Sequence, residues 1–221
     1  MTALRNFVDR LGQHVSGVAM TEFALSLPLL MSAGLWGAET ANLALVHMRV
    51  SQVASHIADN GSRIGDTSTL ADRRIYESDI DDLLLGANIQ AGGSLDFFQH
   101  GRAIVSSLEV DPDDERQYIH WQRCKGVKVF DSSYGTEGDT VAGGMGPPDE
   151  QVTAEPGDAV IFVEVSYEYQ PLISERFFGA TTIQATSAFT VRDDRDLSQI
   201  YQRDPGDPDP VASCGLHDGF S

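Results

Sequence analysis

A long apolar segment near the start of the chain predicts a helix that crosses a membrane. Residues 23–38 contain no charged side chain. A helix needs about 20 residues to cross a hydrocarbon core of about 30 Å, and Val18–Ala38 supplies 21 if Glu22 is tolerated near one end. This length favours a spanning helix over a cleaved secretory signal, and a buried core helix is the alternative. Within the proposed transmembrane segment lie Phe23, Pro28 and Trp36.

The helical pattern continues beyond this span as one apolar stripe on an otherwise polar segment. Asn60-Gly61 and then Gly65 supply stop signals. We therefore expect a transmembrane and amphipathic helix over residues 18–64, preceded by a short leader over residues 1–17. The stripe can pack on the chain's own soluble head or against other subunits in a bundle. Its members are Leu43, Val46, Val50, Val53, Ile57 and Ile64.

The chain beyond the first helix predicts an α+β head over residues 65–192. Residues 69–91 have helical spacing, with Thr69 as a cap and Gly92-Gly93 at the end. Four strand-like runs follow, with a hairpin turn between the first two and a short helical turn, residues 172–178, between the last two. Helix followed by strands predicts an antiparallel sheet with the first helix on one face. The runs are residues 102–110, 117–124, 158–170 and 182–192.

Two segments lack any periodic pattern. Residues 131–156 are rich in Gly, Pro and acidic side chains, and we expect them to be ordered only with a partner or an ion. Residues 193–221 are also acidic and rich in Pro and Gly, which predicts a flexible tail.

Charge divides the molecule into two parts. The net charge is −18, and residues 1–49 carry three basic and three acidic side chains, so all of the net charge lies in residues 50–221. Phosphate backbones would repel such a head, which argues against nucleic acid as a partner. Arg5 and Arg10 precede the apolar span, so the positive-inside rule places the N-terminus in the cytoplasm and the acidic head outside it. Arg49, just past the other end, acts against this assignment.

Glu22 lies near the edge of the apolar span, where a carboxylate costs free energy unless it reaches the interface or meets a partner charge. A cut after Gly17 would leave Val18 at the N-terminus and Glu22 as the fifth residue, which is the pattern of type IV pilins. The sequence GVAMTEFALSLPLL, from Gly17 onward, resembles the start of TadE/TadG-like proteins of the tight-adherence (Flp, type IVb) pilus system. Glu39 matches a second acidic position of that family, and the resemblance covers about residues 16–58.

The resemblance implies a single-pass protein of the bacterial inner membrane, with a cytoplasmic N-terminus and a periplasmic, pseudopilin-like head. It implies the membrane, other pilus or pseudopilin subunits and secretion-platform proteins as partners. A prepilin peptidase would cut between Gly17 and Val18, and Glu22 would then pair with the N-terminal amine of a neighbouring subunit and set the helix register. The leader lacks a strong basic cluster beside Gly17, so its cleavage stays an open question.

The two cysteines, Cys124 and Cys214, predict a disulfide in an oxidising periplasm, with two free thiols as the alternative. The six His residues are scattered and the acid-rich turns lack the EF-hand pattern, so we expect no metal site and no cofactor. The chain also lacks a nucleophile elbow, a phosphate-binding glycine loop and a His-Glu-x-x-His motif, and we expect no enzyme.

Two functions remain. The first is a membrane-anchored minor pseudopilin-like component of tight-adherence pilus assembly. The alternative is an anchored periplasmic binding module of the bacterial envelope that never enters a filament. They differ in their dependence on Glu22.

Overall fold

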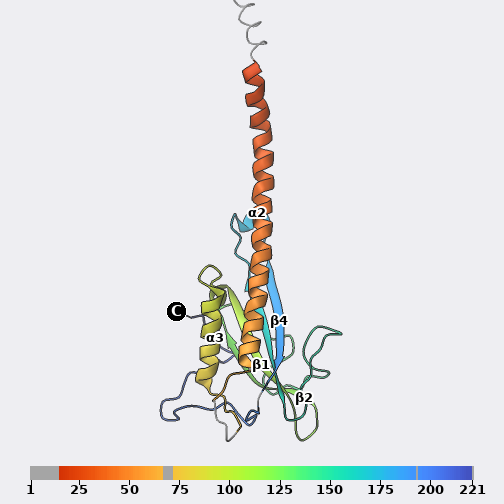
Figure 1. Ribbon diagram of the computed structural model, residues 1–221, viewed down its shortest axis with the longest axis vertical. Helices are drawn as coiled ribbons and strands as arrows, with labels where there is room; N and C mark the ends of the chain where they lie inside the picture. Colours follow the sequence, from red (N-terminus) through yellow and green to blue (C-terminus); the bar gives the residue numbers. More distant parts are fainter. Residues whose placement is uncertain (1–14, 67–71, 193, 221) are drawn as a thin grey trace, which may run out of the picture.

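The computed structural model of the protein describes residues 15–66, 72–192 and 194–220 (Figure 1). The fold is α+β, with a long N-terminal apolar helix and a four-stranded antiparallel sheet, as the sequence predicts. Its elements are α2 (Val15–Gly61), α3 (Glu77–Ala91), α4 (Phe97–His100), β1 (Gly101–Val110), β2 (Gln117–Lys125), β3 (Ala159–Glu168), α5 (Glu175–Phe178) and β4 (Thr182–Thr190).

Helix α2 has two parts with different surroundings. It is 47 residues long, which corresponds to about 70 Å at ~1.5 Å per residue. Residues 17–38 are all exposed, and up to the contact of Trp36 with α5 they stand clear of the head (Figure 1). The part from Val50 onward buries its apolar stripe. From Gly17 the helix is long and apolar enough to cross a membrane. It ends at Gly61, the first of the two predicted stop signals.

The sheet has the strand order β2-β1-β3-β4, and every neighbouring pair is antiparallel. Helices α2 and α3 cover one face, where Ile161, Val163 and Val165 of β3 enter the main core. The alternate residues Val160 and Phe162 face the other side and join a second, smaller core. Because both faces are covered, β1 and β3 are buried along almost their whole length.

The second helix is shorter than the sequence pattern predicts. Its first turn is at Glu77, and the predicted cap, Thr69, lies outside the described residues. Residues 72–76 are not helical, since Tyr76 forms an isolated β-bridge with Tyr201. The backbone N–H of Tyr76 also donates to the carboxylate of Asp79 at 3.0 Å, which starts the helix one residue later. Contacts with a distant part of the chain therefore override the local helical spacing.

Residues 131–156 are ordered in the single chain, contrary to the expectation from their composition. Val141, Met145 and Ala154 are buried against Leu108 and Phe162 on the outer face of the sheet. This apolar face would otherwise be exposed to water, and its burial compensates for the entropy lost when the loop is ordered.

The predicted flexible tail is also ordered over residues 194–220. Cys214 forms a disulfide with Cys124 of β2, and the Cys124 N–H donates to the carbonyl of Ala212 at 2.8 Å. Arg102 of β1, which is 1% exposed, donates to the carbonyls of Cys214 at 2.6 Å and Leu216 at 2.8 Å. The tail is thus a covering element of the head, held by a cross-link and by a buried guanidinium group.

Candidate functional site

The most distinctive polar site lies where α2 leaves the head. Glu39 follows directly after the apolar span and its side chain is 1% exposed. Its carboxylate accepts hydrogen bonds from the Tyr169 hydroxyl at 2.5 Å, the Leu172 N–H at 3.2 Å and the Ile173 N–H at 3.1 Å. These three neutral donors replace the water that a buried carboxylate loses.

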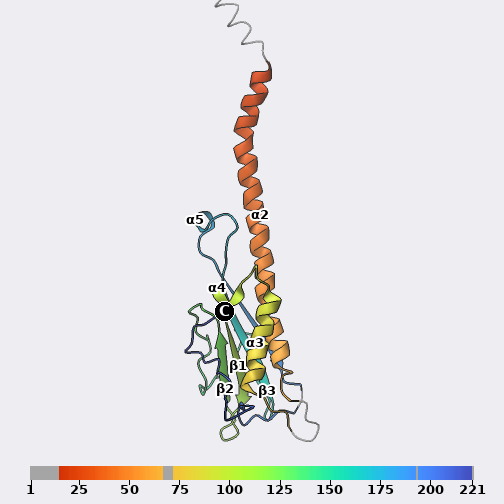
Figure 2. The ribbon, with the colours of Figure 1, turned by 90° about the vertical axis from the view of Figure 1, so that its left-hand side faces the viewer.

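The donors of Glu39 belong to residues 169–181, which join β3 to β4 and are called the connector below. Figure 2 shows the connector, with α5, projecting from the sheet beside α2. Asn42, on the next turn of α2, donates to the Tyr169 hydroxyl at 2.8 Å. Burial raises the pKa of Tyr169, and the hydrogen bond to Glu39 raises it further, so the phenol stays protonated as a donor.

An aromatic pair adds a second attachment between α2 and the connector. The ring centroids of Trp36 and Phe178 are 4.9 Å apart, which is within the range of favourable aromatic contacts. Trp36 is nevertheless 61% exposed. The resemblance drew attention to Glu39 as an acidic position, but its partners come from more than 120 residues away in the chain and no local pattern could reveal them.

The other residues singled out from the sequence lie on the free part of α2. Gly17, Val18, Glu22, Phe23 and Pro28 are all exposed. The described part of the chain brings no second element against them, and a Cβ added at Gly17 would meet no atom within 4 Å among the described residues. In one copy of the chain these residues form a bare helical surface, not an assembled site.

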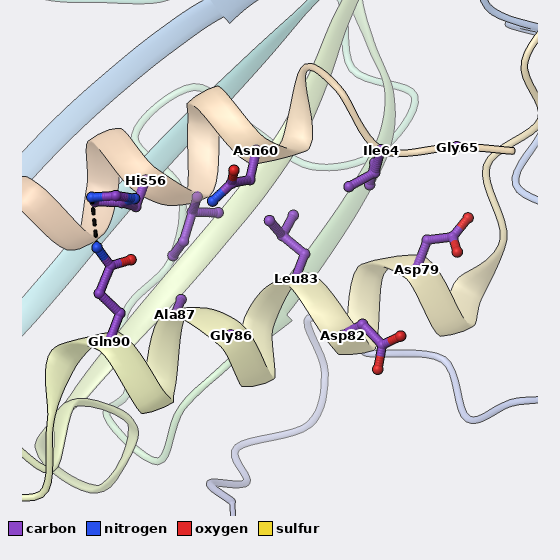
Figure 3. Close-up of a pocket in the computed structure, with 11 residues that line it drawn as sticks. His56, Asn60, Ile64, Gly65, Asp79, Asp82, Leu83, Gly86, Ala87 and Gln90 are labelled. Carbon is purple, nitrogen blue, oxygen red and sulfur yellow. Dashed lines mark hydrogen bonds between the residues drawn. The ribbon is translucent and has the colours of Figure 1, made fainter. Parts of the chain in front are cut away.

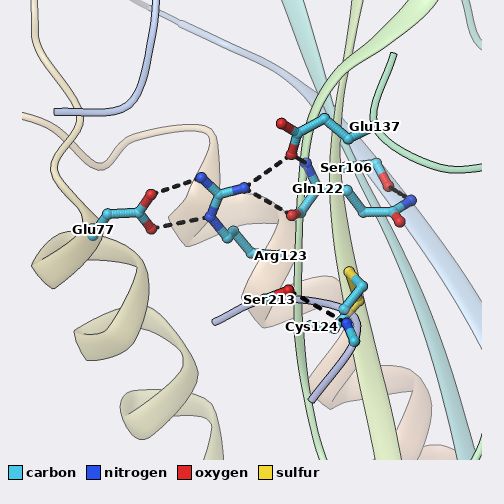
Figure 4. Close-up of polar contacts among 9 residues, drawn as sticks. Glu77, Ser106, Gln122, Arg123, Cys124, Glu137 and Ser213 are labelled. Atoms are coloured by element: carbon cyan, nitrogen blue, oxygen red, sulfur yellow. Dashed lines mark hydrogen bonds and ion pairs between the residues drawn. A yellow bond between two sulfur atoms is a disulfide. The ribbon is translucent and has the colours of Figure 1, made fainter. Parts of the chain in front are cut away.

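Arg123 connects three parts of the head beside the disulfide (Figure 4). Its guanidinium donates to both carboxylate oxygens of Glu77 on α3, at 2.6 and 3.0 Å, and to Glu137 of the outer loop at 3.1 Å. The Arg123 side chain is 12% exposed, and such a paired geometry holds α3 at a fixed angle to β2. No sequence pattern predicts this group, because residues 77, 123 and 137 share no local spacing.

One cluster contains residue types that serve in catalysis. Ser107 donates to Glu109 at 2.6 Å, and His120 Nδ1 lies 2.8 Å from the other oxygen of the same carboxylate. The hydrogen bond with Glu109 raises the pKa of His120, while burial opposes this shift. Glu109 stands between the serine and the histidine, so the imidazole does not contact the hydroxyl that it would have to activate. The cluster fits a polar bracing of the β1–β2 hairpin.

A groove of about 420 Å³ runs between α2 and α3 (Figure 3). Its lining is mixed, with Ile57 and Leu83 among polar side chains, and His56 Nε2 lies 2.6 Å from Gln90 Nε2 across it. Within residues 15–66, 72–192 and 194–220, no three His, Cys, Asp or Glu side chains gather as a metal site would require.

No family model, curated protein or solved structure matches this chain. The likeness of residues 16–58 to TadE/TadG-like proteins therefore stays a prediction. Three features of the structure bear on function: the free apolar part of α2, the attachment of Glu39 to the connector, and the groove between α2 and α3.

Proposed function

We propose that this protein is a membrane-anchored minor pseudopilin-like component of tight-adherence pilus assembly, in the bacterial inner membrane with its head in the periplasm. The observation that carries the proposal is the division of α2. One continuous helix has an exposed apolar N-terminal part and a C-terminal part built into the head. Lipid can surround the free part before assembly, and neighbouring helices can replace the lipid afterwards, without any change in the head.

Glu22 would favour the replacement of lipid by neighbouring helices. A carboxylate in the apolar part is unfavourable in lipid, and it is exposed on α2. If the chain is cut after Gly17, the new amine at Val18 lies one helical turn from Glu22 on the same face. A neighbouring subunit could then pair its amine with Glu22, which removes the cost of the carboxylate and fixes the axial register.

Substitution of Glu22 tests this role. We expect Glu22→Ala to abolish piliation while membrane insertion and the head disulfide stay normal, and Glu22→Gln to be similarly defective because it also lacks the charge. Leu25→Ala is the matched control, since Leu25 is 75% exposed on the same part of α2 and carries no charge. Normal piliation with Glu22→Ala would rule out the pseudopilin mechanism.

Processing of the leader is tested by intact mass and N-terminal sequencing of the membrane-extracted protein. We expect a mature chain that starts at Val18. Gly17→Ala meets no steric obstacle among the described residues, so a loss of cleavage in this variant would report recognition by the peptidase. A chain that still begins at Met1 would contradict the pilin-type mechanism and leave an anchored protein.

The groove between α2 and α3 supports the second candidate, an anchored periplasmic binding module. Gly86 lines this groove, and a Cβ added there meets no atom within 4 Å. Gly86→Leu would therefore partly fill the groove. If this variant loses a partner in co-purification while Glu22→Ala leaves piliation unchanged, the binding module is the better description.

A further inference from the structure

The connector exposes large apolar side chains although its backbone is firmly held. Leu172 is 68% exposed and Ile173 is 38% exposed. The backbone N–H groups of the same two residues donate to the buried carboxylate of Glu39. The backbone of this loop is fixed by a buried carboxylate, while its apolar side chains are exposed. Such an arrangement indicates a contact surface.

The depth of the connector follows from its attachment to α2. Val18–Ala38 contains 21 residues and rises about 31 Å at ~1.5 Å per residue, close to the thickness of a hydrocarbon core. Trp36 lies two residues before the end of this span, where tryptophan is favoured at the boundary between lipid and water. Because the Phe178 ring is 4.9 Å from the Trp36 ring, the connector lies at the same depth.

The hydrogen bonds of Glu39 and Asn42 to the connector agree with this depth. Glu39 and Asn42 come directly after the apolar span and are turned toward Tyr169. The carboxylate of Glu39 is thus shielded by the connector at the height where the helix would emerge from lipid. The apolar surface of α2 meets the connector where Trp36 contacts Phe178, and the exposed Glu175 and Arg176 of α5 lie in the chain between Ile173 and Phe178.

We infer that the connector lies in the membrane interface, with Leu172, Ile173 and Phe178 among the lipid headgroups and the upper acyl chains beside Trp36. The occupant of this surface is lipid, because the surface extends the one that α2 presents to the bilayer. The inference rests on the proposed anchoring of α2. It gives the head two attachments to the membrane, so that entry into a filament would have to release the connector as well as the helix.

Site-directed fluorescence can test the depth of the connector. The two cysteines of the chain are joined in a disulfide, so a single introduced cysteine can be labelled without replacing them. The full chain would be reconstituted in vesicles of phosphatidylethanolamine and phosphatidylglycerol with a nitrobenzoxadiazole label at one of three positions. Ile173→Cys reports the connector and Leu29→Cys the apolar span. Asp113→Cys reports the β1–β2 turn, at the opposite end of the sheet from the connector.

Three quenchers distinguish the outcomes: iodide in water, and nitroxide lipids labelled near the headgroup or deep in the acyl chain. We expect the label at 173 to be quenched most by the shallow nitroxide, with several-fold weaker iodide quenching than at 113. The label at 29 should respond to the deep nitroxide. If the label at 173 is quenched like the label at 113 while the label at 29 is quenched in lipid, the inference about the connector is wrong, but the membrane anchoring of α2 is supported. A label at 173 shielded from all three quenchers would indicate contact with a second copy of the chain and also overturn the inference. Iodide access at both 29 and 173 would overturn the anchor and the inference together.

Discussion

The cross-link between Cys124 and Cys214 should contribute much of the stability of the head. It closes a loop with a sequence separation of 90 residues. On the chain-entropy model, a loop of this length lowers the entropy of the unfolded chain enough to stabilise the fold by about 4–5 kcal/mol. Small domains are stable by only about 5–15 kcal/mol in total. Loss of the bond should therefore bring the head close to unfolding.

The structure adds a reason to expect the upper part of this range. Arg102 is 1% exposed and donates to the carbonyls of Cys214 and Leu216. If the tail departs, this buried guanidinium loses acceptors, and a buried charged donor without an acceptor is costly. We expect the double variant Cys124→Ser/Cys214→Ser to lower the free energy of unfolding by about 5 kcal/mol.

Guanidinium unfolding of the full chain in detergent micelles provides the measurement. Trp121 is 7% exposed and lies on β2, three residues from Cys124. The second tryptophan, Trp36, is on the exposed part of α2, so all samples would carry Trp36→Phe and the fluorescence would report the head. The oxidised parent, the reduced parent and the double serine variant are compared. We expect the last two to unfold together, well below the first.

The reasoning would be refuted if the double serine variant unfolds within about 1 kcal/mol of the oxidised parent, far below the contribution expected for such a loop. That result would mean that the hydrogen bonds of the tail hold it in place without the cross-link. Coincident curves for reduced and oxidised parent, with the thiols shown to be free, would lead to the same conclusion.

Three further predictions concern single sites. Gly144→Ala should loosen the outer loop, because Gly144 has a φ of +90° and an added Cβ would lie 2.1 Å from the Val152 carbonyl oxygen; limited proteolysis should then cut the loop faster than in the parent. The hydrogen bond with Glu109 raises the pKa of His120 above its ordinary 6.5. The resulting stabilisation is complete below pH 6.5 and is lost as pH rises through the higher folded pKa, so unfolding midpoints should decline over this range and His120→Gln should flatten the decline. Glu39→Ala should destabilise the connector by about 1–3 kcal/mol, because the buried Tyr169 hydroxyl loses its acceptor. The effect should be seen as faster hydrogen exchange of the connector amides, and unchanged exchange would show that the carboxylate does not hold the connector.

Local patterns in the sequence were sufficient for the regular elements. The strand run predicted at residues 102–110 is observed as Gly101–Val110, and that at 182–192 as Thr182–Thr190. The end of α2 at Gly61 also agrees with its stop signal. These features depend on side-chain periodicity and on turn residues, which act between neighbours in the chain.

The arrangement around Glu39 could not be predicted in the same way. Its position after the apolar span was visible, and its likeness to a family position was noted. Its burial depends on Tyr169 and on two backbone N–H groups of the connector, which only the pairing of β3 with β4 brings alongside α2. Composition could not predict this, because a carboxylate is exposed or buried according to the donors that the fold places around it.

The sequence by itself determined a long helix with an apolar start, an acidic head of helix and antiparallel strands, and a pair of cysteines able to join. Only the tertiary structure decided that residues 131–156 and 194–220 are ordered. Their composition is typical of flexible chain, but a sheet has two faces and the helices cover one. Burying the second apolar face and supplying carbonyl acceptors to Arg102 stabilise these segments. This gain depends on surfaces that exist only after the sheet has formed.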